Sequence, residues 1–282
     1  IEYTHLKTKD VLKQIRDIKP KIPDMIICIE GEIFNDDAIP NIASINVPRV
    51  WWLLDTHAFN GFFDIQARWA LRTRATNIYC AQRKYCKKFN DDYGLTVKWL
   101  PQGFDSIVYY NRNLPKIYDI AFIAGYLSIE RAKLFERLAK EGLKVDVFSS
   151  APNTWGFTPT FNYHKLDKRL SYEDYSRVLN QTKIGFHQSW KGDSTFRPYE
   201  VTGNNALLLT DRWDGVEDLF VEGKECLIYN DEDEIYKYAS SILNNIDELK
   251  SITDAGYVRA HKDHTFINRV KVILSDIFGK EN

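Results

Sequence analysis

The sequence has neither an excess of one charge nor a long apolar run. Its 282 residues contain 38 Lys and Arg and 39 Asp and Glu, for a formal net charge of −1. This balance gives no global field that would attract nucleic acid, so we expect no nucleic-acid partner and only local basic sites. No apolar run approaches the roughly 18 residues that a membrane-spanning helix requires, and we therefore expect a soluble protein.

Cysteines are few, and the start of the chain lacks a leader. The four cysteines show no Cys-x-x-Cys spacing and lie in or beside apolar segments: Cys28, Cys80, Cys86 and Cys226. They indicate structural thiols in a reducing compartment rather than disulfides or a zinc site, so we expect a cytoplasmic protein. The opening IEYTHLKTKDVL has no initiator Met and no basic-then-apolar leader, which leaves open that N-terminal residues are missing.

Length and element order indicate an α/β protein of two domains. A chain of 282 residues exceeds what one hydrophobic core usually organises. Buried-strand patterns alternate with helical patterns, which predicts mostly parallel, doubly wound sheets. The alternation restarts after NRNLPK, so we expect one Rossmann-like domain over residues 1–114 and a second over 115–282. We expect an irregular segment over 151–166 and leave open that the final helix packs back on the first domain.

The stretch TFRPYEVTGNNALLLTD, residues 195–211, places a carboxylate where a strand gives way to a helix. In open α/β sheets, ligands bind at the carboxyl ends of the strands, and KIGFHQS predicts such a strand just before this stretch. The hydroxyls of Ser194 and Thr195, the Arg197 guanidinium and free N–H groups of a short helix over 196–204 suit phosphate oxygens. Glu200 suits the two hydroxyls of a ribose. A nucleotide diphosphate satisfies both demands.

A structural interpretation of Glu200 also stays open. An acidic residue near a helix start interacts favourably with the helix dipole, and Arg197 could pair with it there. Such a surface arrangement would contribute under about 1 kcal/mol to stability.

The second half of the chain contains two long stretches with recognisable motifs. They are RPYEVTGNNALLLTDRWDGVEDLFVEGKECLIYNDEDEIYKYASSIL and AGYVRAHKDHTFINRV. Both resemble group 1 glycosyltransferases, in particular their CgeB-like (spore-maturation-protein-like) branch. The motif positions of that branch correspond here to Arg197, Tyr199, Glu200, Gly203, Thr210, Asp211, His264, Thr265, Phe266 and Arg269. YDIAFIAGYLSIERAKLFERL and VKWLPQGFDSIVY are also similar to the family, so the resemblance covers about residues 95–275.

The resemblance implies a GT-B fold, in which two Rossmann-like lobes face a cleft. It implies a metal-independent, hexosyltransferase-like enzyme that takes a nucleotide sugar, such as a UDP- or GDP-sugar, as donor substrate and needs no cofactor. The donor would bind the second lobe and the acceptor the first. Many retaining members carry two glutamates eight positions apart, and Gly192 stands eight positions before Glu200. Retention or inversion therefore stays open.

The same resemblance assigns further residues to the donor site. Gly125 would let the backbone approach the ligand, with Arg131 nearby. Tyr199, Gly203 and Asn204 belong to the motif around Glu200 and complete the predicted substrate-binding set.

Two histidines are further candidates for the site. His57 follows the buried strand PRVWWLL, where it could act as a general base on the acceptor hydroxyl, with Asp55 orienting the ring. The alternative is a strand-end histidine that is hydrogen-bonded to a neighbouring loop. We assign His187, in IGFHQS, to sugar or phosphate contact rather than to proton transfer.

A basic segment lies in the first domain. Between residues 65 and 89 the chain has no acidic residue but contains Arg68, Arg72, Arg74, Arg83, Lys84, Lys87 and Lys88. This segment could contact the inner membrane face or an anionic acceptor, although a solvated helix face is the commoner meaning of such a pattern.

The acceptor, whether glycan, lipid or protein, stays open. So does the alternative of a non-catalytic nucleotide- or glycan-binding module with a degenerate glycosyltransferase fold.

Overall fold

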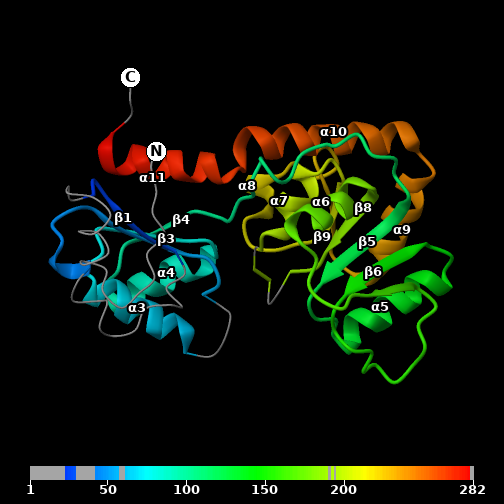
Figure 1. Ribbon diagram of the computed structural model, residues 1–282, viewed down its shortest axis with the longest axis horizontal. Coiled ribbons are helices and arrows are strands. Elements are labelled where there is room, and N and C mark those ends of the chain that lie inside the picture. The colour runs from blue at the N-terminus through cyan, green and yellow to red at the C-terminus, as the bar shows by residue number, and fades with distance from the viewer. Residues whose placement is uncertain (1–22, 30–41, 57–60, 190–191, 194, 280–282) are drawn as a thin grey trace. The chain divides into compact units, whose positions relative to one another are not determined.

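The computed structural model describes residues 23–29, 42–56, 61–189, 192–193 and 195–279. The chain divides into two compact units, the first formed by Ile1–Pro101 with Ser275–Asn282 and the second by Gln102–Leu274 (Figure 1). Residues 102–114 make contacts within the second unit, among them the hydrogen bond from the Arg112 N–H to Asn180 Oδ1 at 2.6 Å. The domain boundary expected after residue 114 stays a prediction.

The first unit contains a parallel sheet in the order β1-β2-β3-β4. Its described elements are β1 (Ile26–Ile29), β2 (Arg49–Leu53), α3 (Phe62–Arg72), β3 (Asn77–Cys80), α4 (Arg83–Tyr93) and β4 (Val97–Trp99). The run VWWL in β2 is buried at every position, as expected for a parallel strand that is covered on both faces. The last residues of α11 (Phe266–Phe278) also belong to this unit, in which Asp276 accepts hydrogen bonds from Tyr79 and Lys98 at 2.8 and 2.7 Å.

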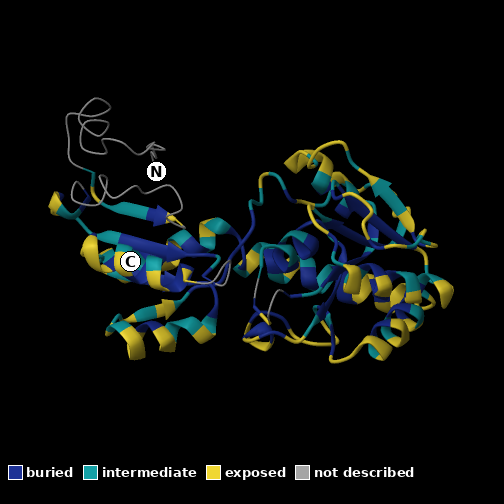
Figure 2. Ribbon diagram, turned by 90° about the horizontal axis from the view of Figure 1, so that it is seen from below, coloured by how far each residue is buried: buried dark blue, intermediate teal, exposed yellow. Residues whose placement is uncertain are grey.

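The second unit contains a six-stranded parallel sheet in the order β10-β9-β8-β5-β6-β7. Its strands are β5 (Tyr118–Ala124), β6 (Val145–Ser149), β7 (Asn162–Lys165), β8 (Thr182–His187), β9 (Leu207–Asp211) and β10 (Leu227–Tyr229). Its helices are α5 (Ile129–Lys140), α6 (Tyr172–Asn180), α7 (Arg197–Gly203), α8 (Val216–Leu219), α9 (Glu232–Leu243), α10 (Ile246–Asp263) and α11 (Phe266–Phe278). Buried residues concentrate on the strands and exposed residues on the outer helix faces (Figure 2).

The order of the strands reverses within this second sheet. The chain runs outward from β5 to β6 and β7, then returns to place β8 beside β5 before it continues to β9 and β10. The carboxyl ends of β5 and β8 therefore flank a topological switch point, which is where open α/β sheets bind ligands.

The expectation of an irregular segment over residues 151–166 is wrong for β7. Asn162–Lys165 pairs in parallel with Asp146–Ser149 of β6. The sequence NYHK shows no apolar alternation because this short strand lies at the sheet edge and is only partly buried. Its His164 ring stacks on Phe148 at 4.2 Å between ring centroids.

The motif His-Thr-aromatic-x-x-Arg, residues 264–269, is hydrogen-bonded to residues 102–104, the segment with which the second unit begins. The Phe104 N–H donates to the His264 carbonyl at 3.2 Å, and the Phe266 N–H donates to the Phe104 carbonyl at 2.9 Å. Buried Arg269 donates to the Gln102 carbonyl at 3.0 Å and to His264 Nδ1 at 3.2 Å. A Cβ on Gly103 would lie 2.7 Å from the His264 carbonyl oxygen, so only glycine permits this close approach.

The His264 ring makes this structure sensitive to acid. Its Nε2 lies 2.8 Å from the Leu219 carbonyl and takes the proton, so Nδ1 can accept from Arg269 only while the ring is neutral. Burial and the Arg269 charge lower the pKa of His264 from 6.5 to about 4. Since the unfolded chain then binds this proton more readily, stability is present in full above about pH 6.5 and falls as the pH drops toward 4.

We expect this group to contribute about 3 kcal/mol to the loss of stability between neutral pH and pH 4. The measurement is calorimetric unfolding of the wild type and of His264→Gln at several pH values, with His164→Gln as the matched control. The His264 variant should be less stable at neutral pH but should lose less on acidification. An unchanged pH dependence would contradict the assignment.

Candidate functional site

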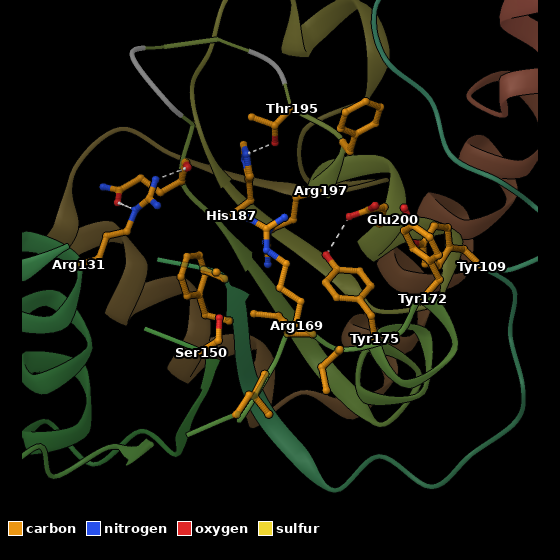
Figure 3. Close-up of a pocket in the computed structure, with 18 residues that line it drawn as sticks. Tyr109, Arg131, Ser150, Arg169, Tyr172, Tyr175, His187, Thr195, Arg197 and Glu200 are labelled. Carbon is orange, nitrogen blue, oxygen red and sulfur yellow. Dashed lines mark hydrogen bonds between the residues drawn. The ribbon is translucent and has the colours of Figure 1, made fainter. Parts of the chain in front are cut away.

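A cavity of about 440 Å³ opens at the switch point of the second sheet (Figure 3). Its floor comes from the ends of β5, at Ile123 to Gly125, and of β8, at His187 and Gln188. The remaining lining residues are Tyr109, Phe122, Arg131, Ser150, Leu166, Arg169, Leu170, Tyr172, Tyr175, Thr195, Phe196, Arg197 and Glu200. The cavity therefore collects six of the residues predicted from the sequence: Gly125, Arg131, His187, Thr195, Arg197 and Glu200.

Three arginines line the described part of this cavity. Arg131 comes from α5 and Arg197 from α7, and their guanidinium carbons lie 5.5 and 5.1 Å from the centre of the Phe122 ring. Arg131 also donates twice to Gln188, at 3.0 Å each to the side-chain and backbone oxygens. Burial and the charge of Arg197 lower the pKa of Arg131. A bound anion would relieve this repulsion between the two cations.

Arg169 is the third cation, and the sequence did not reveal it. It lies in the loop between β7 and α6 and reaches the cavity across Gly125, where a Cβ would stand 3.4 Å from its Nε. Among the described residues, no hydrogen bond or ion pair of its guanidinium is present, and the residue is exposed. No motif marked it, because the loop follows the polar edge strand that sequence patterns did not detect.

Glu200 is the one carboxylate of the described lining. The Tyr175 hydroxyl donates to its Oε2 at 2.8 Å, as Figure 3 shows. Burial raises the pKa of Glu200, while Arg197 and the hydroxyls of Tyr175 and Tyr109 act in the opposite direction. The carboxylate thus faces a cavity that is rich in positive charge and in hydrogen-bond donors.

His187 sits at the floor of the cavity, between two threonine hydroxyls. Its Nδ1 lies 2.8 Å from Thr210 Oγ1 and its Nε2 lies 3.1 Å from Thr195 Oγ1. Burial and the charges of Arg197 and Arg131 hold the pKa of His187 well below its ordinary value. The ring is neutral at physiological pH, which suits hydrogen bonding to a ligand better than proton donation.

A family model described as glycosyl transferase-like matches residues 131–275, about half of the 282 residues. The chain belongs to this family. The matched segment of this glycosyltransferase-like chain includes Arg131, Arg169, Tyr175, Arg197 and Glu200. No curated protein has a significant sequence match to the chain.

Solved structures share the fold. Anabaena Alr3699/HepE in complex with UDP-glucose matches with a TM-score of 0.67 at 12% identity, over 91% of this chain and 79% of that one. TarM matches with a TM-score of 0.67 at 10% identity, over 94% and 57%. Sucrose-phosphate synthase from Thermosynechococcus elongatus matches with 0.63 at 9% identity, over 90% and 73%. The GT-B fold, with its Rossmann-like parallel sheets, is thereby confirmed.

Three of the predicted site residues of this glycosyltransferase-like chain lie behind the cavity rather than on its surface. Tyr199 is fully buried, with its ring centre 5.5 Å from that of His264. A Cβ on Gly203 would lie 2.6 Å from the Phe104 ring, so this glycine lets α7 pack closely on residue 104. Asn204 is also buried, and its amide donates to the Glu200 carbonyl at 2.7 Å.

The predicted acceptor-side residues belong to the first unit. Asp55 lies two residues after the end of β2. His57 lies outside the described residues, and so does Ser194 of the donor-site prediction. Gly192 adopts a left-handed conformation with φ of 72°, which favours glycine at the position where many retaining members carry a glutamate.

The basic residues of the first unit make contacts within that unit. In the basic segment, Lys87 and Lys88 pair with Asp91 and Asp92 one turn later on α4, and the Arg83 guanidinium lies 4.0 Å from the centre of the Trp99 ring.

Among the described residues, no group of three or more His, Cys, Asp or Glu side chains is placed to hold a metal ion. No described helix has both the length and the apolar character needed to cross a membrane.

Proposed function

We propose that this chain transfers a sugar from a nucleotide-diphosphate sugar to an acceptor, as a member of the CgeB-like branch. One observation carries the proposal: a single cavity at the switch point holds three guanidinium groups and one carboxylate. Diphosphate needs positive charge, and ribose needs an acceptor for its two hydroxyls. A nucleotide diphosphate has both features within one molecule. Alr3699/HepE, which shares the fold, was solved with UDP-glucose.

In the proposed reaction, the nucleotide diphosphate is the leaving group. Arg197, Arg131 and Arg169 stabilise the negative charge that grows on it as the glycosidic bond to phosphate breaks, and no metal or cofactor is required. Glu200 holds the ribose, and neutral His187 with Thr195 contacts the phosphate or the sugar. The acceptor is a glycan, lipid or protein whose hydroxyl is deprotonated by His57 with Asp55. We propose a cytoplasmic enzyme, with the basic 68–88 segment as its membrane-facing surface if the acceptor is a lipid.

A second candidate function is nucleotide-sugar binding without turnover. The observation that favours it is Gly192, which stands where many retaining members carry a glutamate. Both candidates predict binding, and only the first predicts release of the nucleotide when an acceptor is present.

The binding step is tested by thermal shift with UDP-glucose, UDP-galactose, GDP-mannose and ADP-glucose. A donor at 100 times its Kd should stabilise the fold by about 2.7 kcal/mol. Release of nucleotide diphosphate is then followed with mixtures of glycan, lipid and peptide acceptors. Failure of every nucleotide sugar to stabilise the protein would contradict the proposal.

We expect Glu200→Gln to weaken binding of the best donor by roughly 1–3 kcal/mol, because a neutral amide oxygen accepts hydrogen bonds more weakly than a charged carboxylate and the amide nitrogen accepts none. Calorimetric titration measures this loss. Glu173→Gln is the matched control, since Glu173 is exposed on α6 and pairs with Arg177. Equal donor affinity in Glu200→Gln and the wild type would return Glu200 to a structural role.

A further inference from the structure

Tyr175 makes a contact that the proposed reaction does not yet use. Its hydroxyl donates to Oε2 of Glu200 at 2.8 Å, and its ring forms part of the cavity wall. The ring is fixed from two sides, by an edge contact with Tyr109 at 6.0 Å between centroids and by the Arg197 guanidinium at 5.9 Å. The Tyr175 hydroxyl is therefore directed at Oε2 of Glu200, and it makes no hydrogen bond to Oε1.

We propose that Tyr175 is a positioning residue, which holds Glu200 ionised and turns Oε1 toward the ribose hydroxyls of the donor. This inference rests on the proposed function, in which Glu200 binds the ribose. Tyr175 itself does not need to touch the donor. A carboxylate has about four lone-pair positions, so the hydrogen bonds from Tyr175 and Tyr109 still leave two acceptor positions for a vicinal diol.

The groups that face Glu200 explain why such a residue is needed. They are Arg197 on the same helix, Tyr175 on α6 and Tyr109 on the segment before β5. Tyr172, also on α6, lines the same cavity. Burial raises the pKa of Glu200, which favours a protonated carboxyl that has lost acceptor capacity. The Tyr175 hydroxyl lowers this pKa again and stays protonated itself, since burial raises its own pKa well above the usual value.

The fold should survive loss of this hydroxyl. The neighbouring Ser176 and Asn180 donate to Oδ1 of buried Asn204 at 2.6 and 2.8 Å, and these bonds join α6 to the end of α7. Neither bond involves Tyr175. A change confined to the Tyr175 hydroxyl therefore alters the carboxylate and leaves the packing of the two helices in place.

The test is calorimetric titration with UDP-glucose between about pH 5 and about pH 8 on four proteins: wild type, Tyr175→Phe, Tyr163→Phe and Glu200→Gln. The phosphates of a nucleotide sugar do not titrate in this range. In Tyr175→Phe the pH midpoint below which affinity is lost should rise by about one unit. Tyr163→Phe removes a hydroxyl that donates to the Ala151 carbonyl outside the cavity, so its midpoint should not move.

The outcomes separate this inference from the proposed function. If Glu200→Gln binds UDP-glucose with the affinity of the wild type, Glu200 does not bind the ribose, and both the proposed role of Glu200 and this inference are wrong. Weak binding by Glu200→Gln, combined with an unmoved midpoint in Tyr175→Phe, overturns the positioning role alone. A second measurement needs no nucleotide: carbon-13 carboxyl titration of the free protein, with the Glu200 signal assigned by its loss in Glu200→Gln. Tyr175→Phe should raise the Glu200 pKa there, and an unchanged value would overturn the inference.

Discussion

Replacing Arg197 by Met should lower kcat/KM for the nucleotide sugar by about 10²–10³-fold, the usual cost of removing one preorganised donor that stabilises a developing charge. Arg197 lies in the cavity between the Phe122 and Tyr175 rings, with its guanidinium carbon 5.1 and 5.9 Å from their centres. In this partly buried position its charge is screened less by water than a surface charge would be. Steady-state kinetics at varied donor concentration measures the loss.

The division of this loss between kcat and KM is informative. A fall in kcat indicates that Arg197 acts mainly on the charge that develops in the transition state, and a rise in KM alone indicates uniform binding of the diphosphate. Arg177→Met is the matched control, because Arg177 is exposed on α6 and pairs with Glu173. Activity of Arg197→Met equal to that of this control would remove Arg197 from the donor site.

Replacing Arg269 by Met should destabilise the second unit by about 3–5 kcal/mol, because buried acceptors lose their donor. The guanidinium supplies three hydrogen bonds, to the carbonyls of Gln102 and Asp263 and to His264 Nδ1, at 3.0, 2.9 and 3.2 Å. Differential scanning calorimetry should show the transition of this unit lowered by roughly 10 °C.

The control for Arg269 lies two residues further along the same helix. Lys271 is exposed, so Lys271→Met removes a positive charge without touching the buried hydrogen bonds and should leave the transition nearly unchanged. Equal unfolding temperatures for the two variants would show that Arg269 does not hold the entry of the chain into the second unit.

Most of the fold could be predicted because buried parallel strands leave a strong pattern. β5, β8 and β9 are short apolar runs bounded by glycine or polar residues, and each was expected close to its observed position. β7 could not be found in this way, since an edge strand has no second neighbour and its side chains remain partly exposed. The cavity residue Arg169 was also missed, because it lies in the loop that follows this undetected strand.

The location of the candidate site was also accessible from the sequence. The strand-to-helix junction after β8 placed Arg197 and Glu200 at a sheet edge, and ligands gather there in open α/β sheets. The partners of Glu200 were not accessible. Tyr109 and Tyr175 come from segments 91 and 25 positions earlier, as the numbering shows, and no spacing rule links them to the carboxylate.

The α/β class, the two-domain length and the junction that carries Glu200 follow from local pattern, because hydrophobic periodicity reports how each segment is buried. Hydrophobic periodicity does not show which face of α7 lines the cavity. Arg197 and Glu200 are three residues apart and share the cavity face, whereas Tyr199 and Gly203 are four apart and share the opposite, buried face. Helical spacing separates the two pairs, but only packing against Phe104 and His264 decides which pair is buried.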